Sequence, residues 1–246
     1  MMKKTLSLVR QAVKTYDMID EGDVIAVGIS GGKDSLVMLA ALNSLKEFYP
    51  KKFDIKAVSI DIGFENASFF QIEKFCESLN IEYTIEKTQI KEIVFDKLKE
   101  KSPCSLCSKM RRATLCKLAK ELGCNKLSLG HNKDDAIETF IMNTIYNGKL
   151  MCFEPVTHYE DIGISIIRPL IFTDEYTIKK YARENSLPVM EKICPADGNT
   201  KREETKRLLG EIKKQNKEAL KNIFTAIKNL PEFKKYEVKS CNENDG

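Results

Sequence analysis

The fold of this chain is decided by the run Val24-Ile25-Ala26-Val27-Gly28-Ile29-Ser30-Gly31-Gly32-Lys33-Asp34-Ser35-Leu36. Its first half is continuously apolar, as expected of a strand that is buried on both faces. Apolar residues resume from Leu36 to Leu42 and predict a buried helix. Gly31 and Gly32 let the backbone turn sharply between the two elements. The free N–H groups at the start of such a helix attract phosphate, so the run predicts an anion site.

Two common phosphate-binding loops are excluded by the residue order. A Walker A loop needs G-x-x-x-x-G-K-[ST], but Asp34 follows Lys33, and Val27 stands where the first glycine is required. There is also no G-x-G-x-x-G fingerprint. An ordinary glycine-rich turn is the plain alternative. The complete order from Ser30 to Ser35 instead resembles the SGGxDS signature of the PP-loop ATP pyrophosphatases. Members of that superfamily cleave ATP to AMP and pyrophosphate and adenylate a substrate oxygen.

Predicted strands alternate with predicted helices along the chain. Further strands are expected at 55–60, 81–85, 127–130 and 164–167. This alternation predicts an α/β domain with a parallel sheet. Ligands bind such sheets at the carboxyl ends of the strands. Ser30, Asp61 and the pair Gly130-His131 each follow a strand there, and their convergence strengthens the prediction of one site.

The chain is predicted to have three parts. An α/β domain fills 1–190 and includes an amphipathic helix at 3–19. A loop and a single long basic helix, with a helical pattern from 200 to about 230, make up 191–230. A polar tail with the composition of a disordered terminus occupies 231–246.

The predicted C-terminal helix is strongly basic. It has four glutamates against nine basic residues, which are Lys201, Arg202, Lys206, Arg207, Lys213, Lys214, Lys217, Lys221 and Lys228. Such a face suits RNA phosphates, and a solvated helix face is the alternative. The formal net charge of +4 decides nothing by itself.

Length and composition suggest an intracellular protein. No stretch approaches the ~18 apolar residues of a membrane span, and 6–9 is too short for the core of a signal peptide. We therefore expect a cytoplasmic protein that does not bind membranes. Its eight cysteines then suggest core thiols plus a metal or redox site, not disulfides.

Three cysteines fall in predicted loops. Cys104 and Cys107 form a C-x-x-C pair behind Pro103, and Cys194 lies far downstream. Chance burial of two thiols is the plain alternative. A structural zinc site normally has four ligands, so three cysteines suit an iron–sulfur cluster with one open iron better. Of the other cysteines, Cys76 and Cys116 are interpreted as core residues, and Cys124 lies at the start of a strand. Cys152 is ambiguous, and Cys241 belongs to the polar tail.

Four blocks of sequence together narrow the resemblance to a smaller group within this superfamily. They are Ser30–Ser35, Cys104-Ser105-Leu106-Cys107-Ser108-Lys109-Met110-Arg111-Arg112, Leu129-Gly130-His131-Asn132-Lys133-Asp134-Asp135 and Arg168-Pro169-Leu170. Their order resembles that of the tRNA 2-thiocytidine synthetases and their 2-thiouridine relatives, over about residues 20–210. Two departures are Asp197 in place of a further cysteine, and Asn132 where many members have a second histidine. Cysteine-rich zinc ribbons are missing, which argues against the 2-thiouridine branch.

The resemblance implies a tRNA sulfurtransferase. It implies ATP and Mg²⁺ in the PP-loop domain, and a [4Fe–4S] cluster held by Cys104, Cys107 and Cys194. The reaction would adenylate a pyrimidine C2 oxygen in tRNA and replace it with sulfur. A cysteine desulfurase or free sulfide would donate the sulfur, and members often act as homodimers.

Roles follow for individual residues. Those expected to bind nucleotide are Gly28, Ser30, Gly31, Gly32, Lys33, Asp34, Ser35, Ile60 and Gly130. Lys33 adds positive charge at the phosphates, and Asp34 and Asp135 bind Mg²⁺ or orient the reacting groups. Arg111 or Arg112 stabilises the transition state, or else contacts tRNA phosphate. Asp135 has a plainer alternative as a carboxylate at a helix N-terminus.

Two other functions remain open from the sequence. A lysidine synthetase-like PP-loop enzyme also adenylates tRNA, but it would not need the three cysteines. A noncatalytic, zinc-dependent RNA-binding module would use the cysteines but not the loop from Ser30 to Ser35.

Overall fold

A computed structural model describes residues 2–64, 68–98, 103–190, 194 and 200–235. The six strands are β1 (Asp23–Gly28), β2 (Phe53–Asp61), β3 (Glu82–Lys87), β4 (Lys126–Ser128), β5 (Val156–Tyr159) and β6 (Ile164–Ile167). They form one sheet in the order β3-β2-β1-β4-β6-β5, parallel except for the pairing of β5 with β6. The predicted α/β class is confirmed.

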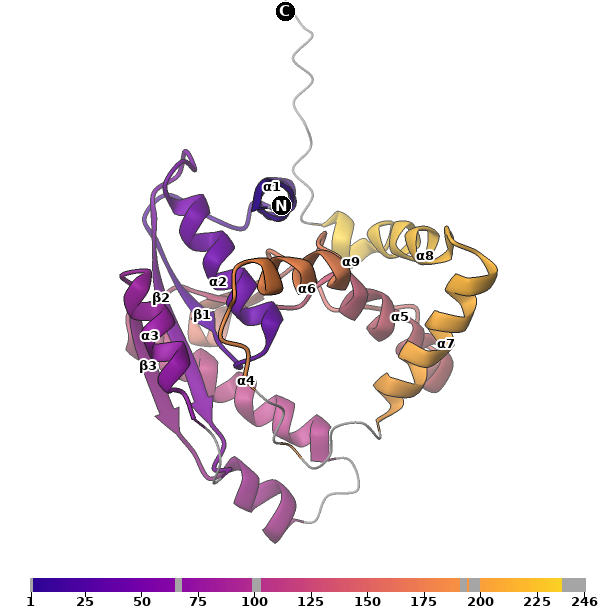
Figure 1. The fold of residues 1–246 in the computed structure, drawn as a ribbon. Coiled ribbons are helices and arrows are strands. Elements are labelled where there is room, and N and C mark those ends of the chain that lie inside the picture. Colours follow the sequence, from indigo (N-terminus) through magenta and orange to yellow (C-terminus); the bar gives the residue numbers. More distant parts are fainter. Residues whose placement is uncertain (1, 65–67, 99–102, 191–193, 195–199, 236–246) are drawn as a thin grey trace, which may run out of the picture.

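Helices cover both faces of this sheet (Figure 1). They are α1 (Met2–Thr15), α2 (Lys33–Lys46), α3 (Phe70–Ser78), α4 (Pro103–Glu121), α5 (Lys133–Asn147), α6 (Glu175–Glu184), α7 (Lys201–Gln215), α8 (Ala219–Lys228) and α9 (Pro231–Lys234), with a π-helical turn η1 (Glu92–Lys97) and a 3-10 turn η2 (Glu160–Ile162).

The core has two clusters, one on each face of the sheet. Ile25 and Val27 of β1 pack with α1, α2 and α6 in the larger cluster, whereas Ala26 packs with α4 in the smaller one. This split follows from the alternation of side chains along a strand. Among the described elements, α4 is the α-helix that supplies the smaller cluster, so it alone closes that face.

Several element predictions need correction. The predicted long basic helix is two helices, because Asn216 takes an extended backbone (φ −139°, ψ 105°) between α7 and α8. The irregular region at 151–163 contains β5, a four-residue edge strand too short to show a period. Within the predicted tail, α9 buries Phe233 completely against Tyr16, with ring centroids 6.1 Å apart. Residues 236–246, including Cys241, lie outside the described part.

The prediction that the C-x-x-C pair lies in a loop is also wrong. Helix α4 begins at Pro103, so Cys104 lies in its first turn and Cys107 at the start of its second. Proline is favoured there, because its fixed φ suits a helix and its missing N–H would have no partner within the helix. The pair is therefore spaced i, i+3 on one face of a helix.

A buried ion cluster joins the amino ends of β1 and β4. Lys126 Nζ lies 2.7 Å from Asp23 Oδ2 and 2.9 Å from Asp20 Oδ2, and it donates to the Met18 carbonyl at 2.9 Å. The Asp23 side chain is only 3% exposed. Both charges are thus removed from water and depend on each other.

We expect Lys126→Ala to destabilise the fold by about 3–5 kcal/mol, because Asp23 would keep its buried charge without its cation. Urea unfolding measures the change. Lys56→Ala serves as the control, because it removes an ion pair at the surface in which Lys56 Nζ lies 3.0 Å from Glu82 Oε2. We expect it to lose only a small fraction of the stability that Lys126→Ala loses. Equal losses in the two variants would contradict the prediction.

Candidate active site at the carboxyl edge of the sheet

The loop between β1 and α2 is closed by its own serines. Ser35 Oγ donates to the Gly32 carbonyl at 2.8 Å and accepts from Ser30 N at 3.2 Å. Ser30 Oγ accepts from Gly32 N at 3.3 Å. Gly31 has φ +79°, a left-handed conformation that favours glycine. No side chain caps the start of α2 at Gly32, so its N–H groups face a ligand position.

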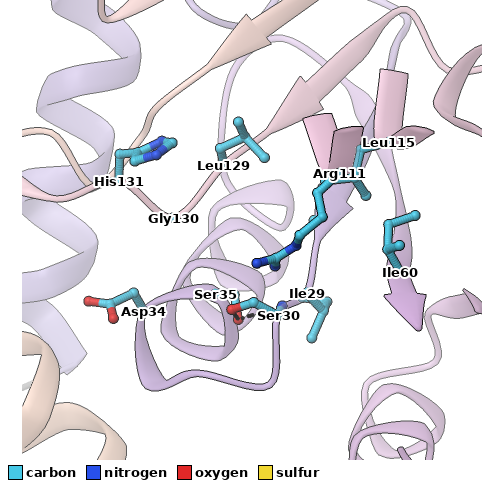
Figure 2. A pocket seen from close by; sticks show the side chains of 11 residues that line it. Ile29, Ser30, Asp34, Ser35, Ile60, Arg111, Leu115, Leu129, Gly130 and His131 are labelled. Carbon is cyan, nitrogen blue, oxygen red and sulfur yellow. Dashed lines mark hydrogen bonds between the residues drawn. The ribbon is translucent and has the colours of Figure 1, made fainter. Parts of the chain in front are cut away.

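A pocket of about 240 Å³ opens beside this loop (Figure 2). It is lined by Gly28, Ile29, Ser30, Asp34, Ser35, Ile60, Arg111, Leu115, Leu129, Gly130 and His131. Ile60 and Leu115 make an apolar side, and the guanidinium of Arg111 points into the pocket from α4. Polar groups for phosphates and an apolar wall for a base thus share one cavity, as a nucleotide site requires.

Gly130 brings the end of β4 against the phosphate loop. A Cβ at this position would lie 3.1 Å from Ser35 N and 3.2 Å from the Asp34 carbonyl carbon. These are backbone atoms, so they cannot swing aside as a flexible side chain does. A side chain here would push the loop out of place, and this close approach explains the glycine.

Asp34 is oriented from the start of α5. Asn132 Nδ2 donates to Asp34 Oδ1 at 2.8 Å. Asn132 is also the N-cap of α5, where its Oδ1 accepts from the N–H groups of Asp134 and Asp135. One buried amide therefore fixes both the helix start and a carboxylate of the pocket. Asn132 was not predicted as a site residue. Its position after Gly130 and His131, at the end of a strand, could have indicated it, because ligands bind at this edge of a parallel sheet.

Asp135 lies outside the pocket lining. Its Oδ2 accepts from Asn132 N at 2.9 Å, which completes a capping box. Its Oδ1 accepts from Arg202 of α7 at 3.3 Å. Burial raises the pKa of Asp135. These contacts favour a structural role, and the catalytic role of Asp135 remains a prediction.

Lys33 is likewise not among the residues that line the pocket. Its Nζ lies 2.9 Å from Asp34 Oδ2 and 3.2 Å from Glu175 Oε1 at the start of α6. Burial opposes ionisation of Glu175, but the charges of Lys33 and Lys206 outweigh it and lower the pKa of Glu175 to about 2. The phosphate loop is thereby linked through ion pairs to α6 and α7.

Two of the predicted RNA-facing cations instead turn toward the protein. Arg202 bonds to Asp135 and Thr139, and Lys206 lies 3.3 Å from Glu175 and 3.9 Å from Glu138. Helix α7 thus packs on α5 partly by charge. The other seven basic positions, of which Lys217 lies between α7 and α8, keep the predicted role in RNA binding as a hypothesis.

His131 closes one side of the pocket. Its ring is tilted by 40° against that of Phe153, with centroids 4.9 Å apart, and its Nδ1 is buried with no hydrogen-bond partner among the described residues. Burial and the charges of Arg168 and Arg202 lower the pKa of His131 to about 3. The imidazole is therefore neutral at physiological pH.

Glu138 gives a pH test of the packing between α5 and α7. Burial and the Asp135 charge raise its pKa from 4.5 to about 7. The folded protein then holds a proton there more tightly than the unfolded chain, so this group lowers stability as pH rises from about 4.5 to 7.

We expect the stability of Glu138→Gln, relative to the parent, to increase over this pH window and to level off above it. Urea unfolding at pH 5 and pH 8 measures the difference. Glu203→Gln, on an exposed position of α7, is the control and should show the same difference at both pH values. A pH-independent difference for Glu138→Gln would refute the assignment.

The three predicted ligand cysteines lie near one another. Burial raises the pKa of the Cys107 thiol, and the charges of Cys194 and Cys104 raise it further, whereas Arg111 lowers it. Cys107 is thus within electrostatic reach of both other thiols. Cys104 is exposed, and Cys107 and Cys194 are half-buried. Cys76, Cys116, Cys124 and Cys152 are buried, which confirms the core assignments of Cys76 and Cys116.

The donor set fits a cluster better than a single ion. Among the described residues, no three His, Cys, Asp or Glu side chains gather closely enough to hold one metal ion. In a [4Fe–4S] cluster each cysteine binds a different iron, so three neighbouring thiols are a suitable ligand set. Arg111 adds positive charge, which lowers the pKa of the Cys107 thiol and favours its thiolate.

The site predictions can now be placed. Gly28, Ser30, Asp34, Ser35, Ile60, Gly130 and Arg111 line the one pocket. Gly31, Gly32 and Lys33 shape the loop from outside that lining. Ile29, Leu115, Leu129 and His131 were not predicted to line it, although His131 was expected at this edge of the sheet. The packing of α4 and β4 brings Leu115, Leu129 and His131 there. No helix in the described part of the chain is long and apolar enough to span a membrane.

Comparison with known proteins identifies the family. The PP-loop domain family matches residues 4–209. The tRNA-cytidine(32) 2-sulfurtransferase of Aliivibrio fischeri is 37% identical over all of this chain and 82% of its own length. That of Citrifermentans bemidjiense is 36% identical over 90% of this chain and 88% of its own length.

A solved structure agrees with these sequence matches. The U34-tRNA thiolase NcsA from Methanococcus maripaludis, with its [4Fe–4S] cluster, superposes with a TM-score of 0.76 and 27% identity, covering 92% of this chain and 77% of that one. The chain belongs to the PP-loop domain family and, within it, to the tRNA-cytidine(32) 2-sulfurtransferases.

Proposed function

We propose that this protein is an ATP-dependent tRNA sulfurtransferase that converts a cytidine, at position 32, to 2-thiocytidine. The observation that carries the proposal is the position of Arg111. This side chain lines the nucleotide pocket and also acts electrostatically on Cys107. Helix α4 therefore joins the site that activates a substrate oxygen to the site that holds the cysteines. Neither the lysidine synthetase-like enzyme nor the zinc-dependent RNA-binding module needs both halves.

The phosphate loop binds and orients ATP. The N–H groups at the start of α2 hold the phosphates, and Ile60 and Leu115 pack against the adenine. Asp34, held by Asn132, is the carboxylate placed to bind Mg²⁺. Attack of the cytidine O2 on the α-phosphorus forms an adenylate and releases pyrophosphate. Arg111 stabilises the negative charge that develops in this step.

Sulfur delivery is the second half of the reaction. Cys104, Cys107 and Cys194 would hold the [4Fe–4S] cluster, whose chemistry when bound is to present sulfur at an iron that no cysteine occupies. Sulfur bonds to C2 of the base, and the original oxygen leaves with AMP. The neutral His131 and the partly buried Phe153 beside it exclude water from the adenylate.

The partners follow from this chemistry. The substrate is tRNA, which implies action in the cytoplasm. The sulfur comes from a cysteine desulfurase or from free sulfide, and the active species is a homodimer. The exposed cations of α7 and α8 contact the body of the tRNA.

Mass spectrometry of tRNA nucleosides tests the proposal. The anaerobically reconstituted protein is incubated with ATP, Mg²⁺, sulfide and unmodified tRNA. We expect 2-thiocytidine at position 32, with one AMP formed for each thiolated base. Omission of ATP should abolish the product. Thiouridine, lysidine or no modified nucleoside would overturn the proposal.

A further inference from the structure

A second, larger cavity lies on the far side of α4 from the nucleotide pocket. This groove, here called the α4 groove, has a volume of about 630 Å³ and runs between α4 and η2. Its floor includes Tyr159 and Ile162, which are partly buried against the smaller core cluster. Its size falls within the range of ~300–1,000 Å³ typical of ligand sites.

The rim of the α4 groove is basic. Lys109, Arg112, Lys117 and Lys120 line it, against one acid, Glu121, among its described lining residues. Lys117 lies 3.6 Å from Glu121, and Lys120 donates to the Ile162 carbonyl. Within the described ranges, no carboxylate lies within ion-pair distance of Lys109 or Arg112. The groove therefore presents uncompensated positive charge above an apolar floor.

The fold explains why the groove is open. On this face of the sheet the smaller core cluster is closed by α4, while the opposite face carries α1, α2 and α6. At the β6–β5 side, apolar floor and lysine side chains remain in contact with solvent. Cations that flank an aromatic ring above an apolar floor are the chemistry that binds unpaired nucleotides, by stacking on the base and pairing with its phosphates.

The α4 groove and the nucleotide pocket are lined by different faces of the same helix. Arg111 lines the pocket and the next residue, Arg112, lines the groove. An RNA segment in the groove would thus lie against the helix that also borders the nucleotide pocket.

We propose that the α4 groove binds an unpaired RNA segment next to the base that is modified. The inference rests on the proposed function, because it takes the substrate to be tRNA. A duplex is disfavoured as the occupant, since A-form RNA is recognised mainly by shape and backbone, whereas this groove offers an apolar floor and a ring.

Salt-dependent binding of tRNA tests the proposal. Lys109→Gln with Lys117→Gln removes two rim charges, and fluorescence anisotropy measures the affinity from about 50 to 200 mM salt. We expect the double variant to bind about tenfold more weakly at low salt. The slope of log K against log salt should become shallower by about 1.4, because each phosphate contact to a single strand contributes about 0.7.

Tyr159→Leu tests the floor separately. It removes the ring but keeps an apolar side chain, so we expect a loss of affinity of about tenfold with an unchanged salt slope. The control is Lys4→Gln with Lys14→Gln, which makes the same charge change on exposed positions of α1 across the sheet. Circular dichroism melting and binding of a fluorescent ATP analogue confirm that each variant is folded.

Several outcomes would overturn the assignment. One is a rim variant that matches the α1 control in both affinity and slope. Another is a rim variant that converts a dimer to a monomer in sedimentation, which would show that the groove binds a second copy of the chain. If the parent fails to thiolate tRNA but the groove variants still weaken tRNA binding, the proposed function fails while the RNA groove stands. If thiolation proceeds and the groove variants bind normally, only the groove is refuted.

Discussion

Gly130→Val will lose ATP-dependent AMP formation by at least about 100-fold while it keeps its iron. Even the first carbon of the new side chain would stand 3.1 Å from Ser35 N and 3.2 Å from the Asp34 carbonyl carbon. Strand β4 is held between β1 and β6, so the phosphate loop is the part that must move. A displacement of about 1 Å at reacting groups is enough for a loss of about 100-fold.

The experiment compares a graded series. The rate of AMP formation by Gly130→Ala should lie between those of the parent and the valine variant, because alanine adds only the first side-chain carbon. Gly210→Ala is the control, since nothing lies within 4 Å of its new carbon and alanine favours a helix. Pyrophosphate release and the binding of an ATP analogue are measured. Normal ATP binding by Gly130→Val would show that the loop does not depend on this approach.

Cys107→Ser will show the opposite pattern. We expect loss of the iron–sulfur cluster and of all thiolation, because serine does not supply the soft thiolate ligand that such clusters need. ATP binding should persist, since Cys107 is not among the residues that line the nucleotide pocket. Iron and sulfide analysis, visible spectra and ATP-analogue binding measure these effects.

Cys116→Ser is the matched control on the same helix. Cys116 is nine residues further along α4 and is buried in the smaller core cluster. We expect it to keep its iron, with some loss of thermal stability from placing a hydroxyl in the core. Cys194→Ser should behave like Cys107→Ser. If Cys107→Ser and Cys194→Ser keep the iron content of the parent, the ligand assignment is wrong.

The two predictions together separate the halves of the site. Gly130→Val removes activation and spares the cluster, whereas Cys107→Ser removes the cluster and spares nucleotide binding. Arg111 belongs to both halves, because it lines the nucleotide pocket and lowers the pKa of Cys107. In the proposed mechanism a single helix thus borders both the activated base and the sulfur source.

The ion pairs of two cations change the view of the C-terminal helices. From composition, Arg202 and Lys206 belong to an RNA-binding face. In the folded chain they contact Asp135, Glu138 and Glu175 and fasten α7 to the domain. A sequence shows the charge of a side chain but not which face of its helix packs on the domain. Here carboxylates of α5 and α6 decide which face of α7 packs.

The sequence alone determined the local chemistry of this protein. A strand, two glycines and a helix in immediate succession need no distant contacts to define an anion site, so the loop from Ser30 to Ser35 was predictable. The alternation of strands and helices likewise fixed the α/β class. The motif blocks and the spacing of Cys104 and Cys107 were sufficient to indicate the family.

Only the tertiary structure decided how distant segments meet. The approach of Cys194 to Cys107, the bond from Asn132 to Asp34 and the contact of Arg202 with Asp135 each join residues that are far apart in the chain. Such contacts depend on the packing of whole helices, which no local pattern records. For the same reason the α4 groove was invisible in the sequence, because it is the part of a sheet face that the packed helices leave open.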